Sequence, residues 1–490
     1  MEIYKKAFGM LCWMLFSMAL MKVTNGYYGI VLTFLGVCFA LARKVGWAIC
    51  HYALLFSMLI INPIVLPKEG YMWALSLRFG PLFIGLALVL MSFRNQGSHR
   101  IPLGGMLPFL FVACISSSYG WVPQISYVKL LNFFVFLMGI WLGVQNLSDK
   151  PSDVIKIRAL FLAFAVFFIA GSIVLIPFPY VSYLSALLAY REDGAFAAME
   201  ATHSMQEAIK SGSAGGYEAL FCGITYQSQT LAPVVALLFA WVFCDMLFVE
   251  KRVRWLHLGL MLAALPLLFM TRSRVAFVTL VSGICVIYFY AAKKIKLPFD
   301  LQNGIKRIMS VFFAFMIIGA IVAEINGQTI TRWMRKTNDV EGDSRDFTEA
   351  FTESRMGLVE QCMYEFERSP VLGSGFQVSE NHVYMMQHSD GLILSAPIEK
   401  GLLPLMVLGE TGIVGAICFV FFLISFYVTA VKRRLFVTIT LFAVFFMANF
   451  GEATFFSPGG MGGVLWLVSF VGGFVIDTIL LNENINTDKV

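Results

Sequence analysis

Long apolar runs alternate with short polar links along most of the 490-residue chain. A run of about 20 apolar residues is long enough to cross the hydrocarbon core of a bilayer as a helix. About fourteen spans are predicted, at 7–21, 27–41, 46–65, 79–93, 103–118, 128–144, 157–176, 231–249, 256–270, 274–290, 309–325, 402–428, 435–448 and 461–481. The pattern predicts an all-α polytopic membrane protein with about 12–14 transmembrane helices and two long outer loops, the second partly helical.

The composition agrees with a membrane protein, because 59% of the residues are hydrophobic and only 13% are charged, against about a quarter in soluble domains. The nine cysteines have no paired spacing, and Cys12, Cys38 and Cys114 lie within apolar runs. They predict core residues and not a disulfide or zinc framework. No metal, cofactor or nucleic-acid partner is expected, and the first apolar run is interpreted as a retained span, not a signal peptide.

Lys and Arg fall on every second link between spans, which sets the orientation, since these residues concentrate on the cytoplasmic side. Both termini are therefore predicted to be cytoplasmic, with the two long loops on the outer side of the membrane. The chain divides into N-terminal spans (1–176), a first outer loop (177–230), central spans (231–325), a large second outer loop (326–401) and C-terminal spans (402–490).

The large loop is the longest polar interval, and residues 346–368 within it predict a helix that ends before Pro370. Its apolar residues form one stripe: Phe347, Phe351, Leu358, Cys362 and Phe366. Arg355 fills the gap in this stripe, so its guanidinium requires an anionic partner where the helix docks.

Residues 271–274, Thr-Arg-Ser-Arg, open a span that runs inwards from the outer side. The free N–H groups and the positive end of the helix dipole would therefore face outwards, together with Arg272 and Arg274. This arrangement favours a phosphate or diphosphate site. The alternative is interfacial snorkelling of the two Arg side chains.

Glu399 and Lys400 lie at the outer start of the next span. A carboxylate beside a cation can act as an ionised general base, although an ordinary helix-capping Glu is the alternative. His382 and His388, in the same loop, are alternative bases or plain surface residues.

Glu410 lies within a span, where a carboxylate is costly unless paired, so a structural or functional role is predicted. The glycines around it have a spacing that predicts close helix packing: Gly409, Gly412 and Gly415. Three other acidic residues near span ends are predicted to be solvated: Asp245, Glu324 and Asp477.

Several of these motifs occur together in one order: 271–274 opening a span, Arg355 followed by 367–375, and Glu410-Thr-Gly-Ile-Val-Gly at 410–415. The chain thereby resembles the bacterial O-antigen ligase and Wzy-type polysaccharide polymerase family. Residues 223–229 also look like the family's usual approach to the following span, so the similarity covers about 223–415.

The resemblance implies a metal-independent membrane glycosyltransferase that transfers a glycan from undecaprenyl diphosphate to an acceptor sugar at the periplasmic face of the bacterial inner membrane. It also implies that the two outer loops are periplasmic and that the large loop, 326–401, is catalytic. Arg274 and Arg355 would bind the diphosphate, with Arg272 assisting and Lys400 nearby. The family's His-Asn pair, with the His acting on the acceptor, is replaced here by Lys400 and Gly401. The base therefore stays open between Glu399, His382 and His388.

The predicted function is a polysaccharide polymerase for O-antigen or exopolysaccharide. One alternative is an O-antigen ligase that adds the glycan to lipid A-core of lipopolysaccharide. An alternative of another class is a transporter or flippase for a lipid-linked glycan, for which internal repeats and midplane charges would be expected. Expected partners are the donor lipid, the acceptor glycan, the bilayer, and chain-length regulator and flippase proteins.

Overall fold

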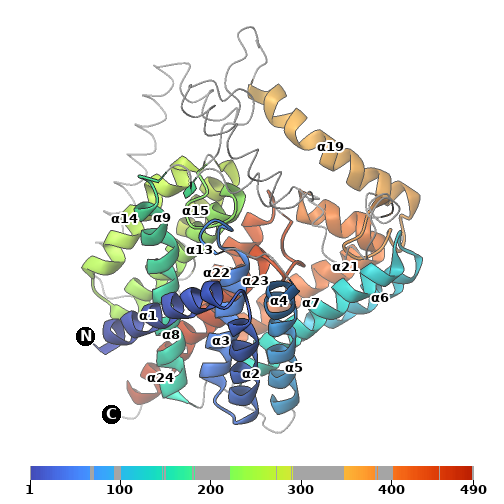
Figure 1. Cartoon of the computed structure of the whole chain (residues 1–490). Coiled ribbons are helices and arrows are strands. Elements are labelled where there is room, and N and C mark those ends of the chain that lie inside the picture. The colour runs from blue at the N-terminus through green and yellow to red at the C-terminus, as the bar shows by residue number, and fades with distance from the viewer. Residues whose placement is uncertain are drawn as a thin grey trace. The chain divides into compact units, whose positions relative to one another are not determined.

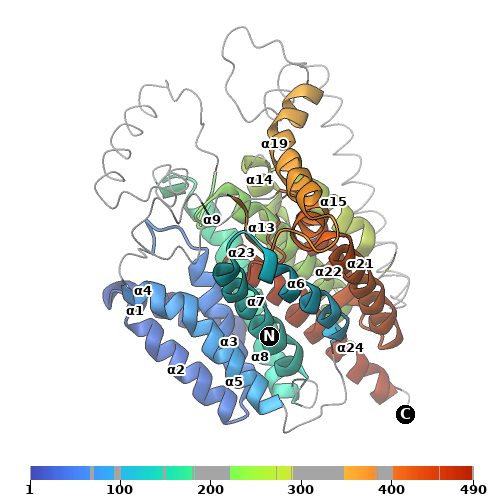
Figure 2. The same ribbon diagram turned by 90° about the vertical axis from the view of Figure 1, so that its right-hand side faces the viewer.

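The computed structural model describes residues 2–66, 71–92, 101–145, 147, 150–178, 181–182, 221–271, 273–287, 290, 347–380, 383, 401–451 and 453–487. The side chains of Arg274 and of residues 347–355 are outside this description. The described chain is helical apart from its links and one isolated β-bridge, between Ile61 and Thr225 (Figures 1 and 2). The all-α fold class is therefore confirmed.

Among the described helices, seven are long and apolar enough to cross a membrane, and further apolar helices are shorter. The protein is therefore a multi-pass membrane protein. Each predicted span within the described residues corresponds to a helix, whereas the span at 309–325 lies outside them. The predicted span at 46–65 is too long, because helix α3 ends at Leu59 and the chain turns at Pro63. Proline has no N–H to continue a helix.

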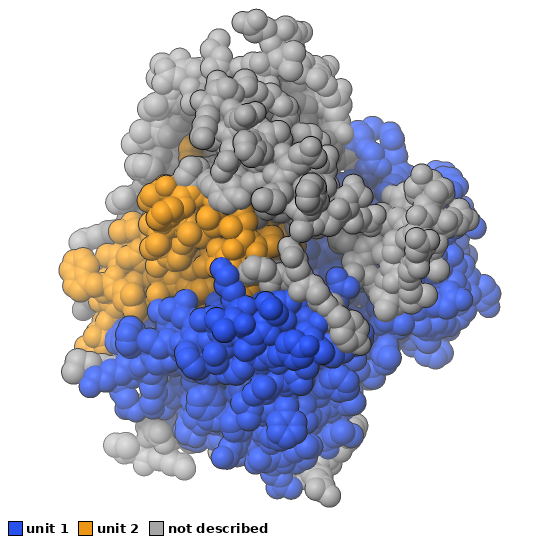
Figure 3. Space-filling model, viewed as in Figure 1, with its two compact units in different colours: residues 1–59, 68–163, 356–490 blue, residues 60–67, 164–355 orange. Residues whose placement is uncertain are grey.

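The chain forms two compact units (Figure 3). Unit 1 comprises residues 1–59, 68–163 and 356–490, and unit 2 comprises residues 60–67 and 164–355. The main helices of unit 1 are α1 (Glu2–Val23), α2 (Tyr28–Leu41), α3 (Val45–Leu59), α5 (Gly80–Ser92), α6 (Leu107–Tyr119), α7 (Pro123–Val144), most of α8 (Pro151–Ala165), the second half of α19 (Phe347–Arg368), α21 (Leu403–Lys432), α22 (Phe436–Ala448), α23 (Met461–Trp466) and α24 (Gly473–Thr487).

Glycines allow α2, α5 and α7 to pack closely side by side. A Cβ added to Gly36 of α2 would lie 2.4 Å from Ile84, and one added to Gly139 of α7 would lie 3.1 Å from the Cα of Gly85. Such close approach of helix backbones is typical of membrane bundles, where van der Waals packing replaces the hydrophobic effect between helices.

Aromatic rings fill the core between α6, α21, α22 and α23. The rings of Phe109 and Phe456 stack with their centroids 5.0 Å apart, and those of Trp466 and Phe470 stack at 4.5 Å. The buried indole N–H of Trp466 donates a 2.6 Å hydrogen bond to the carbonyl oxygen of Phe455. The rings of this core are therefore closely packed, and the polar N–H of its tryptophan has a hydrogen-bond partner.

Neighbouring contacts show which helix ends of unit 1 lie together. Helix α6 runs antiparallel to α21, because its start at Gly105 meets Ser425 and its end at Ser116 meets Glu410. Helices α2, α5 and α7 run parallel to one another. Gly29 and Gly36 of α2 meet residues 76 and 84, and residues 85 and 88 of α5 meet Gly139 and Gly143 of α7. The turn after α2 and the turn before α8 are therefore at one end of the unit, and the turn between α6 and α7 is at the other.

Unit 2 is built on η3 (Val166–Ala170), α9 (Gly171–Val174), α13 (Ser228–Cys244), η4 (Asp245–Glu250), α14 (Trp255–Met270) and α15 (Arg274–Val286). The segment before α13 pairs with the chain after α3: the amide of Asn62 donates to the carbonyl of Ile224 at 2.8 Å, and the amide of Tyr226 donates to that of Ile60 at 3.0 Å. This pairing fixes the approach to α13, which is almost entirely buried.

The prediction that Asp245 and Asp477 are solvated is wrong. Asp245 is fully buried and lies 2.9 Å from the Nε2 of His257 on α14, also fully buried. Asp477 on α24 is 1% exposed and accepts hydrogen bonds from the backbone amides of Val437 and Thr438 at the start of α22. Each carboxylate is tolerated because it has hydrogen-bonding partners inside the bundle. Glu324 lies outside the described residues.

Candidate functional site

Helix α21 is broken at Gly412, whose backbone has φ 64° and ψ −168°. A break leaves carbonyls before it and amides after it without partners within the helix. The loop that follows α19 supplies these partners. The amides of Ser374 and Gly375 donate to the carbonyls of Gly409 and Glu410 at 3.0 and 3.1 Å. In return, the amides of residues 413 and 414 donate to the carbonyls of residues 370 and 371 at 2.8 and 3.3 Å.

Glycine is required at both sides of this interlock. A Cβ on Gly412 would lie 2.3 Å from the carbonyl oxygen of Val371, and a Cβ on Gly373 would lie 2.2 Å from the carbonyl carbon of Glu410. Gly373 also has a positive φ of 77°. Of the three glycines predicted to pack helices, Gly409 does so, because its added Cβ would lie 3.0 Å from the carbonyl oxygen of Cys362 on α19. Gly412 instead packs against a loop and itself breaks the helix.

Hydroxyl groups at the end of α6 and the start of α7, and the turn between these helices, hold the same loop. The Ser116 hydroxyl donates to the carbonyl of Glu410 at 2.6 Å and accepts from the amide of Gly375 at 3.1 Å. The hydroxyl of Ser126 lies 2.8 Å from the carbonyl of Phe376, and the amide of Trp121 donates to the carbonyl of Ser374 at 3.1 Å. Three elements thus converge on residues 373–376, which we call the GSG loop.

Two carboxylates are buried against the GSG loop. Glu410 is 1% exposed and Glu365 of α19 is 2% exposed. The hydroxyl of Ser374 lies 3.4 Å from Oε2 of Glu365 and 3.1 Å from the carbonyl oxygen of Gly409. A role for Glu410 was expected from its place in a span, whereas sequence reasoning missed Glu365. The sequence signal for Glu365 was its place three residues after Cys362, which puts it on the same buried face of α19.

The predicted helix at 346–368 is confirmed as α19, and its C-terminal end is held against the α6–α7 turn. The guanidinium carbon of Arg368, the last residue of α19, lies 3.6 Å from the ring centroid of Trp121. Trp121 packs on a small apolar cluster made of Val122, Ile125 and Val378. A cation at the end of a helix is favoured both by the ring and by the helix dipole. Figures 1 and 2 both show this end of α19 beside α6 and α21.

The corner at 271–274 belongs to unit 2 and has the predicted form. Helix α14 ends at Met270 and α15 begins at Arg274. Ser273 caps α15 through its hydroxyl, which accepts a 3.4 Å hydrogen bond from the amide of Ala276. Arg274 is therefore the first residue of a capped helix, at the positive end of the helix dipole.

The remaining predicted site residues are only partly described. Arg355 lies on α19, but its side chain is outside the described residues, as is that of Arg274. Arg272 lies outside them altogether, and so do the remaining candidates: His382, His388, Glu399 and Lys400. A meeting of these groups at one diphosphate stays a prediction.

A comparison with known protein families matches one interval of the chain, and this interval contains the corner, α19, the GSG loop and Glu410. Residues 260–420 match the family model described as O-antigen ligase. The match covers the motifs from 271 to 415, whereas the segment 223–229, which also contributed to the resemblance, precedes it. A search of curated proteins finds no significant match to the chain.

Proposed function

Because residues 260–420 match the family model described as O-antigen ligase, we propose that this membrane protein is a polysaccharide polymerase. It transfers a glycan from undecaprenyl diphosphate to the hydroxyl of an acceptor sugar at the periplasmic face of the inner membrane. The observation that carries the proposal is Arg274 as the first residue of α15, behind the Ser273 cap. This is where free amides, the helix dipole and a guanidinium together favour a diphosphate.

The proposed reaction is a direct displacement at the anomeric carbon. The acceptor oxygen forms a bond to that carbon, the bond to the diphosphate oxygen breaks, and undecaprenyl diphosphate leaves. The acceptor proton passes to a base, for which Glu399 is the favoured residue. Arg274 and Arg355, with Arg272 and Lys400 nearby, neutralise the charge that develops on the leaving diphosphate, so a metal ion is not required.

The position of α19 supports a role for Arg355. The C-terminal half of this helix is anchored by the Arg368–Trp121 contact and by the burial of Glu365. A catalytic guanidinium must be held in place, since its benefit depends on groups that are oriented before the reaction. Arg355 lies 13 positions before Arg368 on the same continuous helix, so anchoring one end restricts the other.

The test is transfer in vitro from an undecaprenyl-diphosphate oligosaccharide in the presence of EDTA. Arg274→Ala and Arg355→Ala should each lower turnover by about a hundredfold or more, the effect of removing one donor to a developing negative charge. Arg254→Ala is the matched control, because Arg254 precedes α14 at the end opposite the 271–274 corner and pairs with Glu250. Unchanged turnover in both Arg274→Ala and Arg355→Ala would rule the mechanism out.

An O-antigen ligase is the alternative, because the matched family model fits a ligase and a polymerase equally. The polymerase is preferred on the length of the chain and the absence of the His-Asn pair before Glu410. The products distinguish the two functions. A ladder of glycan lengths on undecaprenyl diphosphate indicates polymerisation, whereas a single addition to lipid A-core indicates ligation. Donor lipid that changes sides without forming a new glycosidic bond would indicate a flippase.

A further inference from the structure

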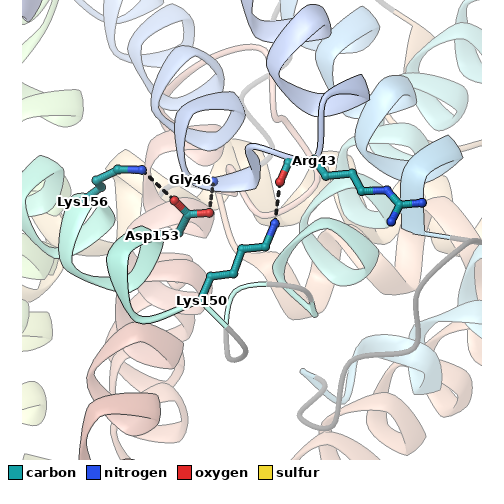
Figure 4. Close-up of polar contacts among 5 residues, drawn as sticks. All are labelled: Arg43, Gly46, Lys150, Asp153 and Lys156. Carbon is teal, nitrogen blue, oxygen red and sulfur yellow. Dashed lines mark hydrogen bonds and ion pairs between the residues drawn. The ribbon is translucent and has the colours of Figure 1, made fainter.

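A group of cationic side chains lies where the α2–α3 turn meets the start of α8, in unit 1 (Figure 4). Arg43 and Lys44 form the turn, and both are exposed. Lys150 precedes α8 and donates a 2.6 Å hydrogen bond from Nζ to the carbonyl oxygen of Arg43. We call Arg43, Lys44 and Lys150 the basic turn. It lies at the opposite end of the unit 1 helices from the GSG loop.

Asp153 joins the two elements that carry the basic turn. One oxygen of its buried carboxylate accepts from the amide of Gly46 at 3.3 Å, and the other contacts Nζ of Lys156 at 2.8 Å. A Cβ on Gly46 would lie 2.8 Å from Asp153, so only glycine allows this approach. The basic turn is thus held in place by contacts between residues 107 positions apart in the sequence.

The carboxylate of Asp153 neutralises Lys156, which leaves the three cations of the basic turn. No carboxylate of the described residues forms an ion pair with Arg43, Lys44 or Lys150. Figure 4 shows the guanidinium of Arg43 directed away from the network below it. Asp149, next to Lys150 in sequence, lies outside the described residues. Three cationic residues on two elements that are in contact favour an anionic ligand.

Apolar side chains border the basic turn on the side towards the helices. Leu41, at the end of α2, is 51% exposed, and Ile155, five residues after Lys150 on α8, is 37% exposed. The Nζ of Lys44 lies 6.0 Å from the ring centroid of Phe39. Cations at helix ends beside exposed apolar side chains match a molecule that has an anionic head and hydrocarbon chains.

We propose that the basic turn binds the phosphate of an anionic phospholipid headgroup, with the acyl chains lying along Leu41 and Ile155. The bound lipid bridges the α2–α3 turn and the start of α8, and so stabilises the packing of the two elements. This role is independent of glycan transfer. It also goes beyond the general enrichment of Lys and Arg at one membrane face, because it depends on where these cations are placed.

The turn between α21 and α22 provides a matched control. It also places two exposed cations, Lys432 and Arg434, at a helix end, and Arg434 has a positive φ of 57°, as Arg43 has at 58°. The double variants R43Q/K44Q and K432Q/R434Q therefore remove the same charge from the same kind of turn. If the two double variants differ in lipid binding, the position of the cations matters. If they are affected equally, only the net charge of the protein matters.

The experiment measures the thermal unfolding midpoint of delipidated, detergent-solubilised protein during titration with phosphatidylglycerol, phosphatidylcholine or inorganic phosphate. Native mass spectrometry counts the bound lipids in parallel. Phosphatidylglycerol should raise the midpoint of the wild type and of K432Q/R434Q, and phosphatidylcholine should not. R43Q/K44Q should weaken the apparent affinity for phosphatidylglycerol about thirtyfold, as expected for the loss of two cations near an anionic headgroup.

Three results would overturn the proposal. R43Q/K44Q could keep the full response to phosphatidylglycerol, or both double variants could lose it equally. Inorganic phosphate could also raise the midpoint as much as the lipid does, in which case the ligand is not a phospholipid. If R43Q/K44Q is too unstable for a thermal titration, the lipid count on the single variant Lys44→Gln, against Lys432→Gln, decides between the same outcomes.

Discussion

The hydroxyl of Ser116 donates a 2.6 Å hydrogen bond to the backbone carbonyl of Glu410, although the two residues are 294 positions apart in the sequence. This carbonyl belongs to the last turn of α21 before its break at Gly412. The bond connects the first half of the chain to the domain that matches the O-antigen ligase family. The GSG loop, which also bonds to Ser116, therefore depends on helices outside the matched domain.

Replacing Ser116 with Ala should lower the free energy of unfolding by about 1 kcal/mol, because two buried hydrogen bonds are lost while the carbonyl of Glu410 and the amide of Gly375 stay bonded to each other at 3.1 Å. Ser116 is fully buried, so water cannot take the place of its hydroxyl. The thermal unfolding midpoint of the detergent-solubilised protein measures the effect. Ser118→Ala, on the exposed side of the same helix, is the control and should leave the midpoint almost unchanged. Equal midpoints for the two variants would contradict the structural role of Ser116.

Gly412→Ala should cost about 2 kcal/mol or more in the free energy of unfolding. The backbone of Gly412 has a conformation that L-residues rarely adopt, and an added Cβ would lie 2.3 Å from the carbonyl oxygen of Val371. Gly357→Ala on α19 is the control, since no heavy atom lies within 4 Å of its added Cβ. A helical glycine of this kind should gain slightly from Ala. A Gly412→Ala protein as stable as wild type would mean that α21 is continuous.

Arg368→Gln should lower the free energy of unfolding by about 1 kcal/mol, the usual contribution of a cation over an aromatic ring. Glu367→Gln changes a neighbouring exposed charge and serves as the control. A double-mutant cycle with Trp121→Leu separates the contact from other effects of each substitution. The coupling energy in the cycle should account for most of the loss, and a coupling near zero would show that Arg368 and Trp121 act independently.

Asp477→Ala should lower the free energy of unfolding by about 2 kcal/mol, because Asp477 caps α22 from a neighbouring helix. Its carboxylate accepts 2.9 Å bonds from the amides of Val437 and Thr438 and a 2.7 Å bond from the Thr438 hydroxyl. Asp477→Asn keeps one acceptor oxygen and should recover part of the loss. If Ala and Asn prove equally stable, capping is not what this residue contributes.

The helices themselves could be predicted from sequence, since apolar length and the stripe on α19 are local properties. The bounds of α19 agree with the prediction to within one residue at the start, Asp346 against Phe347. The corner at Ser273 was likewise predictable, because a hydroxyl residue before an apolar run is a local signal for a helix start.

The burial of acidic residues could not be predicted in the same way. Asp477 and Asp245 lie near the ends of spans, and sequence position alone suggests access to water. Their burial depends on partners 39 and 12 positions away, respectively, which only the packing brings together. The same holds for the break at Gly412. Its spacing from Gly409 and Gly415 indicates packing, whereas the backbone groups at the break are bonded by a loop that precedes the break by about 40 residues.

Glu399→Gln should lower the turnover of the proposed transfer by about a hundredfold or more, the usual contribution of a general base. His382→Ala and His388→Ala should retain most of the wild-type rate. All three variants are compared at equal amounts of folded protein, with thermal midpoints as the check. If Glu399→Gln keeps its activity while one His variant loses it, the base is that histidine, even though the guanidinium groups still hold the diphosphate. If only Arg274→Ala and Arg355→Ala lose activity, the result supports the proposed donor site, and none of Glu399, His382 and His388 is the essential base.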